Sequence, residues 1–162
     1  MEKKNNHKSG FVSIIGNPNV GKSTFLNALL GSDISIVTPK AQTTRHRILG
    51  IVNGTDFQVV FSDTPGIIKP SYEMQNSMMN FVKESLKDAD IIIYMVTAGD
   101  ENLNDQKLLN QIKKTKSPLF VLINKIDKST QKLVEKKVDY WKGIFPLAKV
   151  YPISALNGFF IS

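Results

Sequence analysis

The chain has 162 residues, of which 41% are hydrophobic and 22% are charged, and its net charge is +7. This length suits one domain with a hydrophobic core and is too short for two ordinary domains. The sequence contains no cysteine, which excludes a disulfide framework and a thiolate metal site. The apolar run IIIYMV is far shorter than a membrane span. The positive charge suits an anionic partner such as RNA or acidic lipid, although lysines scattered over solvated helix faces explain it more simply.

Apolar runs of strand length alternate along the chain with segments of helical periodicity. The predicted strands cover residues 11–16, 46–52, 57–63, 90–96, 118–124 and 149–154, and the predicted helices cover 22–30, 73–88, 103–114 and 130–142. This alternation predicts an α/β fold, with a mostly parallel six-stranded sheet covered by helices on both faces. The stretch VNGTDF between the second and third strands is a hairpin signal, which predicts one antiparallel edge strand.

The first strand and the first helix are joined by GNPNVGKST, residues 16–24. Gly16, Gly21, Lys22 and Ser23 satisfy the pattern G-x-x-x-x-G-K-[ST], with a strand before it and a helix after it. Glycines let the backbone curl so that successive N–H groups converge on phosphate oxygens, and the helix dipole favours the anion. Lys22 is predicted to reach the β- and γ-phosphates of a nucleotide, and the Ser23 hydroxyl to bind Mg²⁺. The candidate binding residues here are Gly16, Asn17, Pro18, Asn19, Val20, Gly21, Lys22, Ser23 and Thr24; a chance turn is the alternative.

Two segments are candidates for sensing the terminal phosphate. The aperiodic stretch 32–45 contains QTTR, where Thr44, or less readily Thr43, would bind Mg²⁺ and close over the γ-phosphate. The alternative is that this stretch is only a polar segment that precedes a strand. DTPG, residues 63–66, follows the third strand, so that Asp63 can hold Mg²⁺ through water and the Gly66 N–H can contact the γ-phosphate. The whole segment, Asp63, Thr64, Pro65 and Gly66, is otherwise a plain turn.

Two further segments predict recognition of guanine. NKID, residues 124–127, follows the fifth strand, and Asp127 can accept hydrogen bonds from the N1–H and 2-amino groups of guanine. Asn124 would fix the loop and face the 6-oxo side, and the stem of Lys125 would cover the ring; a solvent-facing turn is equally compatible. The candidate residues here are Asn124, Lys125, Ile126 and Asp127. The second segment, Ser154, Ala155 and Leu156, follows the last strand, and its Ala155 N–H would donate to the guanine 6-oxygen.

The ordered set GNPNVGKS, QTTRHR, DTPG, NKID and SAL resembles the translational GTPase-like superclass of P-loop GTPases. More narrowly, GNPNVGKST with KAQTTRHRILGI and DTPGI is similar to the Era family of bacterial GTPases, from about Phe11 to Gly158. The resemblance implies a P-loop GTPase fold, binding of GTP and GDP, slow Mg²⁺-dependent hydrolysis and a role in small ribosomal subunit assembly. It also implies a cytoplasmic protein, loosely associated with the inner face of the cell membrane and monomeric.

The chain departs from the Era pattern at its end. Members of that family carry, after the GTPase domain, another helix and a KH domain that binds the RNA of the small ribosomal subunit. The sequence stops at Ser162, so we expect both to be absent and residues 1–162 to form a single GTPase domain, with 1–9 as a flexible tail. Without the KH domain, the resemblance gives little reason to expect direct binding of this chain to ribosomal RNA or the pre-ribosome. The missing last helix should also expose part of one sheet face and lower stability.

A second feature concerns catalysis. Ras-like enzymes carry a glutamine after the DxxG glycine to orient water, whereas this chain has Ile67, an apolar residue that Era relatives share. Hydrolysis would then depend on Lys22, Thr44, the Gly66 N–H and Mg²⁺. Asn19 matches a residue that helps to bind K⁺ in related potassium-activated GTPases, which implies K⁺ as a further cofactor. The alternative function is a nucleotide-binding module with little turnover and no RNA binding; an ATP-using enzyme is disfavoured by NKID.

Overall fold

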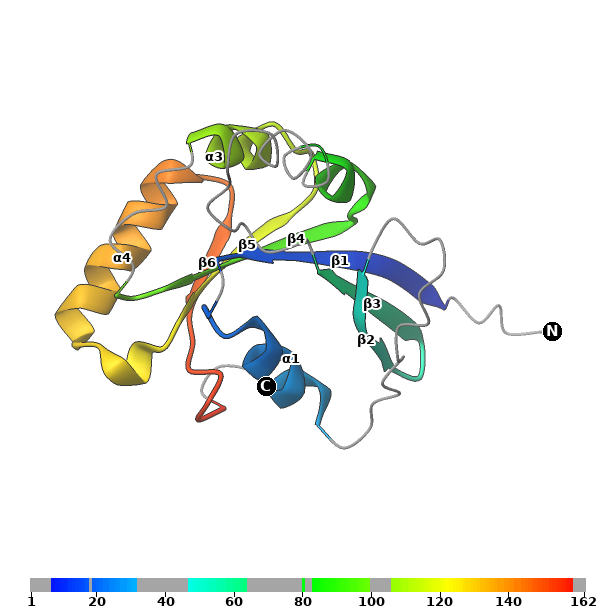
Figure 1. Ribbon diagram of the computed structural model, residues 1–162, viewed down its shortest axis with the longest axis horizontal. Helices are drawn as coiled ribbons and strands as arrows, with labels where there is room; N and C mark the ends of the chain where they lie inside the picture. The colour runs from blue at the N-terminus through cyan, green and yellow to red at the C-terminus, as the bar shows by residue number, and fades with distance from the viewer. Residues whose placement is uncertain are drawn as a thin grey trace.

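The computed structural model describes residues 7–17, 19–31, 47–63, 80, 83–99 and 106–158. Within these ranges a six-stranded sheet has the spatial order β2-β3-β1-β4-β5-β6 (Figure 1). The strands are β1 (Lys8–Gly16), β2 (Arg47–Asn53), β3 (Phe57–Asp63), β4 (Ile91–Thr97), β5 (Leu119–Asn124) and β6 (Lys149–Pro152). Only β2 is antiparallel to its neighbour, β3, and all the other pairs are parallel. The predicted mixed sheet with one antiparallel edge strand is therefore confirmed.

The first strand begins earlier than its apolar run predicts. Lys8 pairs with Phe57 and Ser9 with Gln58 in the parallel ladder between β1 and β3. The apolar run covers only residues 11–16, so the sequence predicts these two residues in the flexible N-terminal tail. Pairing with β3 instead makes them part of β1. The sheet therefore extends beyond the apolar part of β1.

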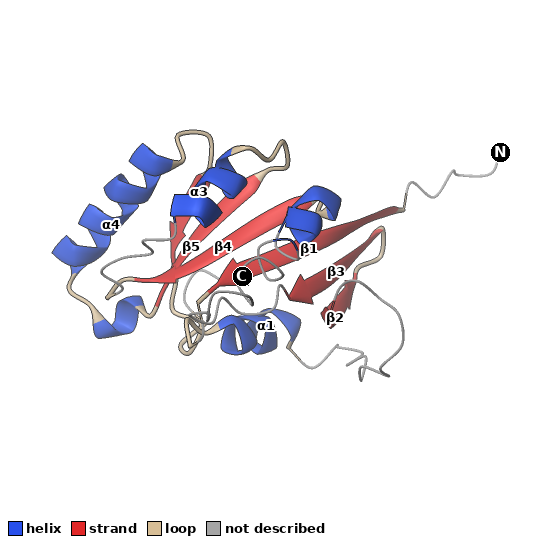
Figure 2. Ribbon diagram, turned by 45° about the horizontal axis from the view of Figure 1, so that its top comes forward, coloured by secondary structure: helices blue, strands red, loops and turns tan. Residues whose placement is uncertain are grey.

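The helices lie on both faces of the sheet, as predicted. They are α1 (Lys22–Leu30), α3 (Gln106–Lys113) and α4 (Gln131–Ile144), with a short 3-10 helix η1 (Ile126–Lys128) and a helical segment over residues 83–88. Figure 2 shows α1 on one side of the sheet and α3 and α4 on the other. The hydroxyl of Thr130 accepts a hydrogen bond from the Leu133 N–H at 3.4 Å, which caps the start of α4. No helix in the described ranges has the length and apolar character needed to cross a membrane.

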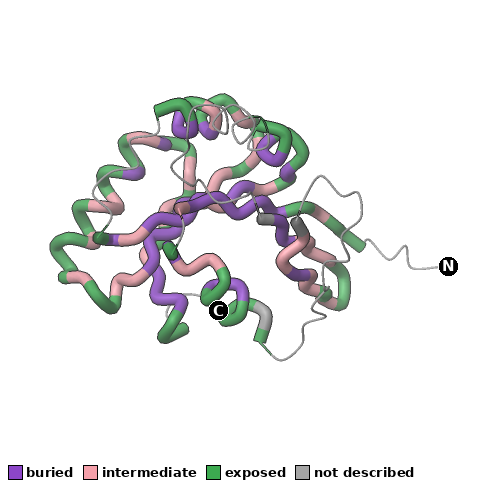
Figure 3. The backbone as a smooth tube through the Cα atoms, viewed as in Figure 1, coloured by how far each residue is buried: buried purple, intermediate pink, exposed green. Residues whose placement is uncertain are grey.

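Each face of the sheet carries its own hydrophobic cluster, and the buried residues concentrate along the central strands (Figure 3). Beneath α3 and α4, the buried Tyr94 ring of β4 meets Trp141 edge to face, with centroids 5.4 Å apart, and Phe145 at 6.2 Å. Beneath α1, the buried side chains Phe25 and Leu26 pack with Val12, Ile14 and Phe61. These two clusters fix α1 and α4, and with them the loops that precede both helices.

The outer strands leave aromatic surface exposed. On β5 and β6 the rings of Phe120 and Tyr151 stack at 6.3 Å, and the Lys149 ammonium lies 5.7 Å from the Phe120 centroid. Phe120 is two residues from Leu122, which belongs to the cluster beneath α1, so the stacked pair lies on the α1 side of the sheet. Tyr151 is exposed there.

Candidate functional site

The candidate site lies at the carboxyl ends of the parallel strands β1, β5 and β6. Gly16 at the end of β1 pairs with Met95 of β4, and Asn124 at the end of β5 pairs with Thr97. Because these strands run in the same direction, the loops after them meet at one edge of the sheet, where open α/β sheets bind ligands. Three predicted segments, residues 16–24, 124–127 and 154–156, are thus brought together.

The loop after β1 is shaped by tight backbone packing. A Cβ atom at Gly16 would lie 2.6 Å from the Met95 carbonyl oxygen, so only glycine lets the loop start this close to β4. At the other end Gly21 has a φ of 99°, in the left-handed region that favours glycine. Between them Asn19 also has a positive φ, 64°, and the buried Val20 side chain anchors the loop in the core. The backbone therefore curls between its two glycines, as the motif predicts.

The amino end of α1 faces this curled loop and suits an anion. In the described structure α1 has no side-chain cap and no acidic residue in its first turn, so the positive end of its dipole is not neutralised there. Lys22 places its ammonium on the Gly16 carbonyl at 2.8 Å, which holds the charge over the loop. Ser23 and Thr24 follow it on the exposed side of the first turn. These groups together offer a lysine, two hydroxyls and a helix N-terminus to a phosphate chain.

A single buried side chain joins the loops of the site. Asn124 is 2% exposed; its Nδ2 donates to the Val20 carbonyl at 2.8 Å, and its Oδ1 accepts from the Ala155 N–H at 2.9 Å. A Cβ at Gly21 would lie 2.3 Å from the same Nδ2. Asn124 therefore fixes the loops after β1 and β6 in one position, and Gly21 is required for its close approach.

The other two polar residues of NKID are also held in place. Lys125 has a φ of 61°, and its ammonium donates to the Asn19 carbonyl at 2.5 Å, so that its stem extends toward the phosphate-binding loop. Asp127 is exposed, and one of its carboxylate oxygens accepts a hydrogen bond from the buried Ser154 hydroxyl at 2.6 Å. The carboxylate predicted to read guanine is thus oriented by a residue of the SAL segment.

The main-chain donor of the SAL segment is engaged within the protein. The Ala155 N–H, predicted to donate to the guanine 6-oxygen, donates to Asn124. Leu156 beside it is exposed, and the Asn157 N–H approaches the Ser154 hydroxyl at 3.4 Å. Sequence reasoning did not find that Ser154 positions Asp127, because the two residues are 27 positions apart and only the packing of β5 against β6 brings them together.

Of the remaining predicted site residues, some lie outside the described parts of the chain and one, Asp63, is described. Pro18, Thr44, Thr64, Pro65 and Gly66 lie outside the described residues. Asp63 ends β3, where its backbone pairs with Ile14 of β1, two residues before Gly16. The backbone thus brings Asp63, the first residue of DTPG, to the edge of the sheet where the phosphate-binding loop begins.

The donor set of the site fits a magnesium ion that a nucleotide phosphate helps to bind. No cluster of three or more acidic, histidine or cysteine residues occurs in the described parts of the chain. The hydroxyl of Ser23 is exposed at the first turn of α1 beside the cradle that Gly16 and Gly21 form. Since Mg²⁺ typically uses one or two protein ligands together with substrate phosphates and water, this sparse oxygen set is compatible with it.

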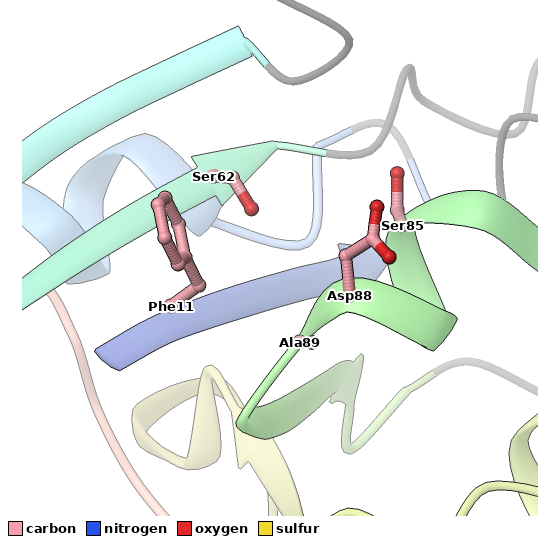
Figure 4. A pocket seen from close by; sticks show the side chains of 5 residues that line it. All are labelled: Phe11, Ser62, Ser85, Asp88 and Ala89. Carbon is pink, nitrogen blue, oxygen red and sulfur yellow. The ribbon is translucent and has the colours of Figure 1, made fainter.

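A cavity of about 230 Å³ lies elsewhere, between β1, β3 and the helical segment 83–88. Figure 4 shows Phe11 and Ser62 projecting from the two strands and Ser85 and Asp88 from the helical segment. Ser85 is buried and Asp88 is exposed. The described lining contains none of the predicted site residues, so this cavity is separate from the candidate site.

The glycine-curled loop before α1, the lysine over it and the buried asparagine that joins it to the loops after β5 and β6 define a P-loop domain of the GTPase type. Residues 11–125 match the sequence model of the family described as 50S ribosome-binding GTPase. Since this match covers well over half of the chain, the chain belongs to that family.

Curated relatives give the same assignment. The chain is 44% identical over 152 residues to GTPase Era of Clostridium beijerinckii and 45% identical over 151 residues to GTPase Era of Clostridium kluyveri. Each alignment covers 93% of this chain but only 51% and 52% of the two relatives, so the chain spans about half the length of the curated relatives it matches. The resemblance to Era family GTPases that the motifs indicate is therefore confirmed.

Solved structures with the same fold include two Era proteins. An Era variant from Aquifex aeolicus bound to GDP.AlF4- superposes with a TM-score of 0.73 and 44% identity, over 94% of this chain and 53% of that one. Era in complex with MgGDPNP and nucleotides 1506–1542 of 16S ribosomal RNA superposes with a TM-score of 0.74 and 43% identity, over the same shares of the two chains. The predicted P-loop GTPase fold is thus confirmed.

Proposed function

We propose that this chain binds GTP together with Mg²⁺, hydrolyses it to GDP and phosphate, and acts as a nucleotide-dependent switch. The observation that carries the proposal is the buried Asn124, which holds the phosphate-binding loop at Val20 and the SAL segment at Ala155. One ligand that spans both loops has to carry a phosphate chain at one end and a polar ring at the other. The relatives bound to GDP.AlF4- and MgGDPNP support a guanine nucleotide as that ligand.

The guanine end of the proposed site is built around a positioned carboxylate. Asp127 accepts from Ser154 with one oxygen and is exposed, so its carboxylate can accept from the guanine N1–H and 2-amino groups. The Lys125 stem, drawn toward the Asn19 carbonyl, would cover one face of the ring. Leu156, exposed beside the Ala155 N–H that Asn124 engages, completes the proposed contact set.

In the proposed reaction a water oxygen bonds to the γ-phosphorus and the bond to the β–γ bridging oxygen breaks. One water proton stays on the released phosphate, the other passes to solvent, and GDP and phosphate leave. Lys22, held over the loop at the Gly16 carbonyl, would move to the β- and γ-phosphate oxygens and neutralise their charge. When bound, Mg²⁺ would add further positive charge, with Ser23 and Thr44 as its proposed direct ligands and Asp63 holding it through water. The Gly66 N–H would contact the γ-phosphate. Position 67 is isoleucine, so no side chain there orients the water.

Phosphate release and nucleotide affinity, measured on the same protein, test this function. We expect the unmodified chain to release phosphate from GTP in Mg²⁺ buffer, and Lys22→Ala to slow release about a hundredfold. Lys132→Ala, at an exposed position of α4, is the matched control and should match the unmodified rate. Tight GDP binding with no phosphate release above the Lys22→Ala rate would instead favour the alternative, a nucleotide-binding module with little turnover.

We further propose that K⁺ accelerates hydrolysis through Asn19. This residue is exposed on the phosphate-binding loop and holds a positive φ, so an alanine there would remove the amide and strain the backbone at once. Asn19→Gly removes the amide and tolerates the conformation. We expect faster turnover in KCl than in NaCl for the unmodified chain, and no preference in either variant. Equal rates in the two salts for the unmodified chain would exclude this role.

The cellular role is proposed from the Era relatives. One of them is solved with nucleotides of 16S ribosomal RNA, which supports a role for this chain in small ribosomal subunit assembly. We propose a monomeric, cytoplasmic domain with peripheral contact to the inner face of the cell membrane. Filter binding to 16S ribosomal RNA at several salt concentrations tests the RNA contact, because phosphate contacts weaken steeply with salt. Sedimentation with anionic vesicles tests the membrane contact, and sedimentation velocity the oligomeric state.

A further inference from the structure

A groove of about 470 Å³ lies far from the candidate nucleotide site, between the connection from α3 to β5 and the connection from α4 to β6. Its two walls are residues 112–119 and residues 143–148. Leu119 in its lining begins β5, whereas Asn124 of the candidate site ends the same strand. An occupant of this groove would therefore leave the nucleotide site open.

Both walls of the groove are fixed by internal hydrogen bonds. On the first wall, Thr115 donates its hydroxyl to the Ile112 carbonyl at 2.8 Å, and Ser117 donates its hydroxyl to the Ala89 carbonyl at 2.7 Å. On the second wall, the Ala148 N–H donates to the Phe145 carbonyl at 3.0 Å and closes a turn with Pro146 in its second position. A groove that is already formed loses little conformational entropy when it binds a partner.

The second wall exposes an apolar side chain that the fold does not use. Leu147 is 100% exposed at the tip of the turn, whereas Phe145, which starts the same turn, is 5% exposed and packs in the core beside Trp141. Ile144 and Ala148 on either side pack only partly against the core. Covering the Leu147 side chain with a partner would remove a large apolar surface from water.

The charges around the groove have one sign. Its described lining contains Lys113 and Lys116 and no acidic residue. Lys113 lies in the last turn of α3, where it offsets the negative end of the helix dipole, equivalent to about half a charge. Lys116 lies beyond the helix, is exposed, and has no such role. The groove therefore keeps a net positive potential that complements an acidic partner.

We propose that this groove docks an acidic segment of a partner protein that inserts a large apolar side chain against Leu147 and places carboxylates on Lys113 and Lys116. RNA is the less suitable occupant, because base stacking needs an exposed aromatic face and the aromatic side chain in the described lining, Phe145, is buried. This proposal does not depend on nucleotide binding or hydrolysis.

Fluorescence anisotropy with three matched probe peptides of about twelve residues tests the docking. The first carries Leu-Phe at its centre with Asp and Glu on both sides, the second has Lys in place of the acids, and the third has Ala in place of Leu-Phe. Against the full chain with GDP present, we expect only the first to bind with a dissociation constant below about 1 mM. Failure of the first peptide to bind, or equal binding of the second, would overturn the proposal.

Variants of the chain then test whether the first peptide binds in this groove. We expect Leu147→Ser to weaken binding of the first peptide about tenfold and Lys116→Glu about threefold. The matched controls, Leu133→Ser and Lys132→Glu on the first turn of α4, should leave it unchanged, since both lie at the other end of that helix. Equal loss in the control variants would assign the binding to general charge or hydrophobicity. Preferential binding of a uridine oligonucleotide, sensitive to Lys116→Glu, would replace the protein partner by RNA.

Discussion

The side-chain amide of Asn124 donates to the Val20 carbonyl across 2.8 Å, although 104 positions separate the two residues in the chain. The same side chain accepts the Ala155 N–H, so one buried group connects the loop that would bind phosphate with the loops that would bind the base. The positions of these loops relative to one another are thus fixed by the protein itself. Such preorganisation would lower the entropy cost of ordering the loops when a ligand binds across them.

Asn124→Ala should damage both stability and nucleotide affinity. The substitution leaves the Val20 carbonyl and the Ala155 N–H without their partner in a buried position, which costs about 2 kcal/mol of unfolding free energy. The loops would then move independently, and affinity for GDP should fall at least tenfold. Urea unfolding followed by Trp141 fluorescence, and titration with a fluorescent GDP analogue, measure the two effects. Asn157→Ala, at an exposed position whose described contact uses only its backbone N–H, should change neither.

Gly21→Ala should abolish nucleotide binding through a clash with Asn124. The added Cβ would lie 2.3 Å from Nδ2, and it would also be strained because φ is 99°. Gly31→Ala separates the two causes, since φ is 47° there and nothing lies within 4 Å of the place that its methyl carbon would take. We expect Gly31→Ala to lose about 2 kcal/mol of stability with normal GDP affinity, because its backbone lies in a region that is nearly restricted to glycine. If Gly21→Ala behaves like Gly31→Ala in a GDP titration, the close packing against Asn124 has no role in binding.

Ser154→Ala should reduce discrimination between purine bases. Without the 2.6 Å hydrogen bond from Ser154, the Asp127 carboxylate loses its fixed orientation. Affinity for GDP should fall by about tenfold, and affinity for IDP, which lacks the 2-amino group, should fall less. Asp127→Asn should instead shift preference toward xanthine nucleotides. Competition titrations with GDP, IDP and XDP measure these ratios, and an equal loss for all three in Ser154→Ala would reduce its role to general stability.

Most of the sheet could be predicted from the sequence because its signals are local. Each apolar run maps onto a strand, and the VNGTDF turn marks the antiparallel pair β2 and β3. The extension of β1 to Lys8 could not be predicted in this way, because polar residues form a strand there only by pairing with β3. Local patterns identify a strand, but its ends are set by the neighbour.

The features of the candidate site also differ in whether a local sequence pattern predicts them. Gly16 and Gly21 stand in a fixed local motif, so the curl of the loop between them could be predicted from spacing alone. The double role of Asn124 and the orientation of Asp127 by Ser154 depend on contacts between loops that only the assembled sheet brings together. The donation of the Ala155 N–H to Asn124 is a further such contact, and the SAL segment carries too little local pattern to predict it.

Thr130→Ala tests whether the N-terminal cap of α4 contributes only to stability and not to GDP affinity. The Thr130 hydroxyl caps the helix by accepting from the Leu133 N–H, and losing such a cap costs about 1 kcal/mol. For a chain of this size the melting temperature should fall by about 2–4 °C. Asp127 lies on η1 before this cap and is held by Ser154, so GDP affinity should stay unchanged. Thr55→Ala, whose hydroxyl has only a 3.5 Å contact with Asp56, is the control and should keep the melting temperature. A parallel fall in GDP affinity and melting temperature in Thr130→Ala would mean that the cap, and not Ser154 alone, holds the base-reading carboxylate.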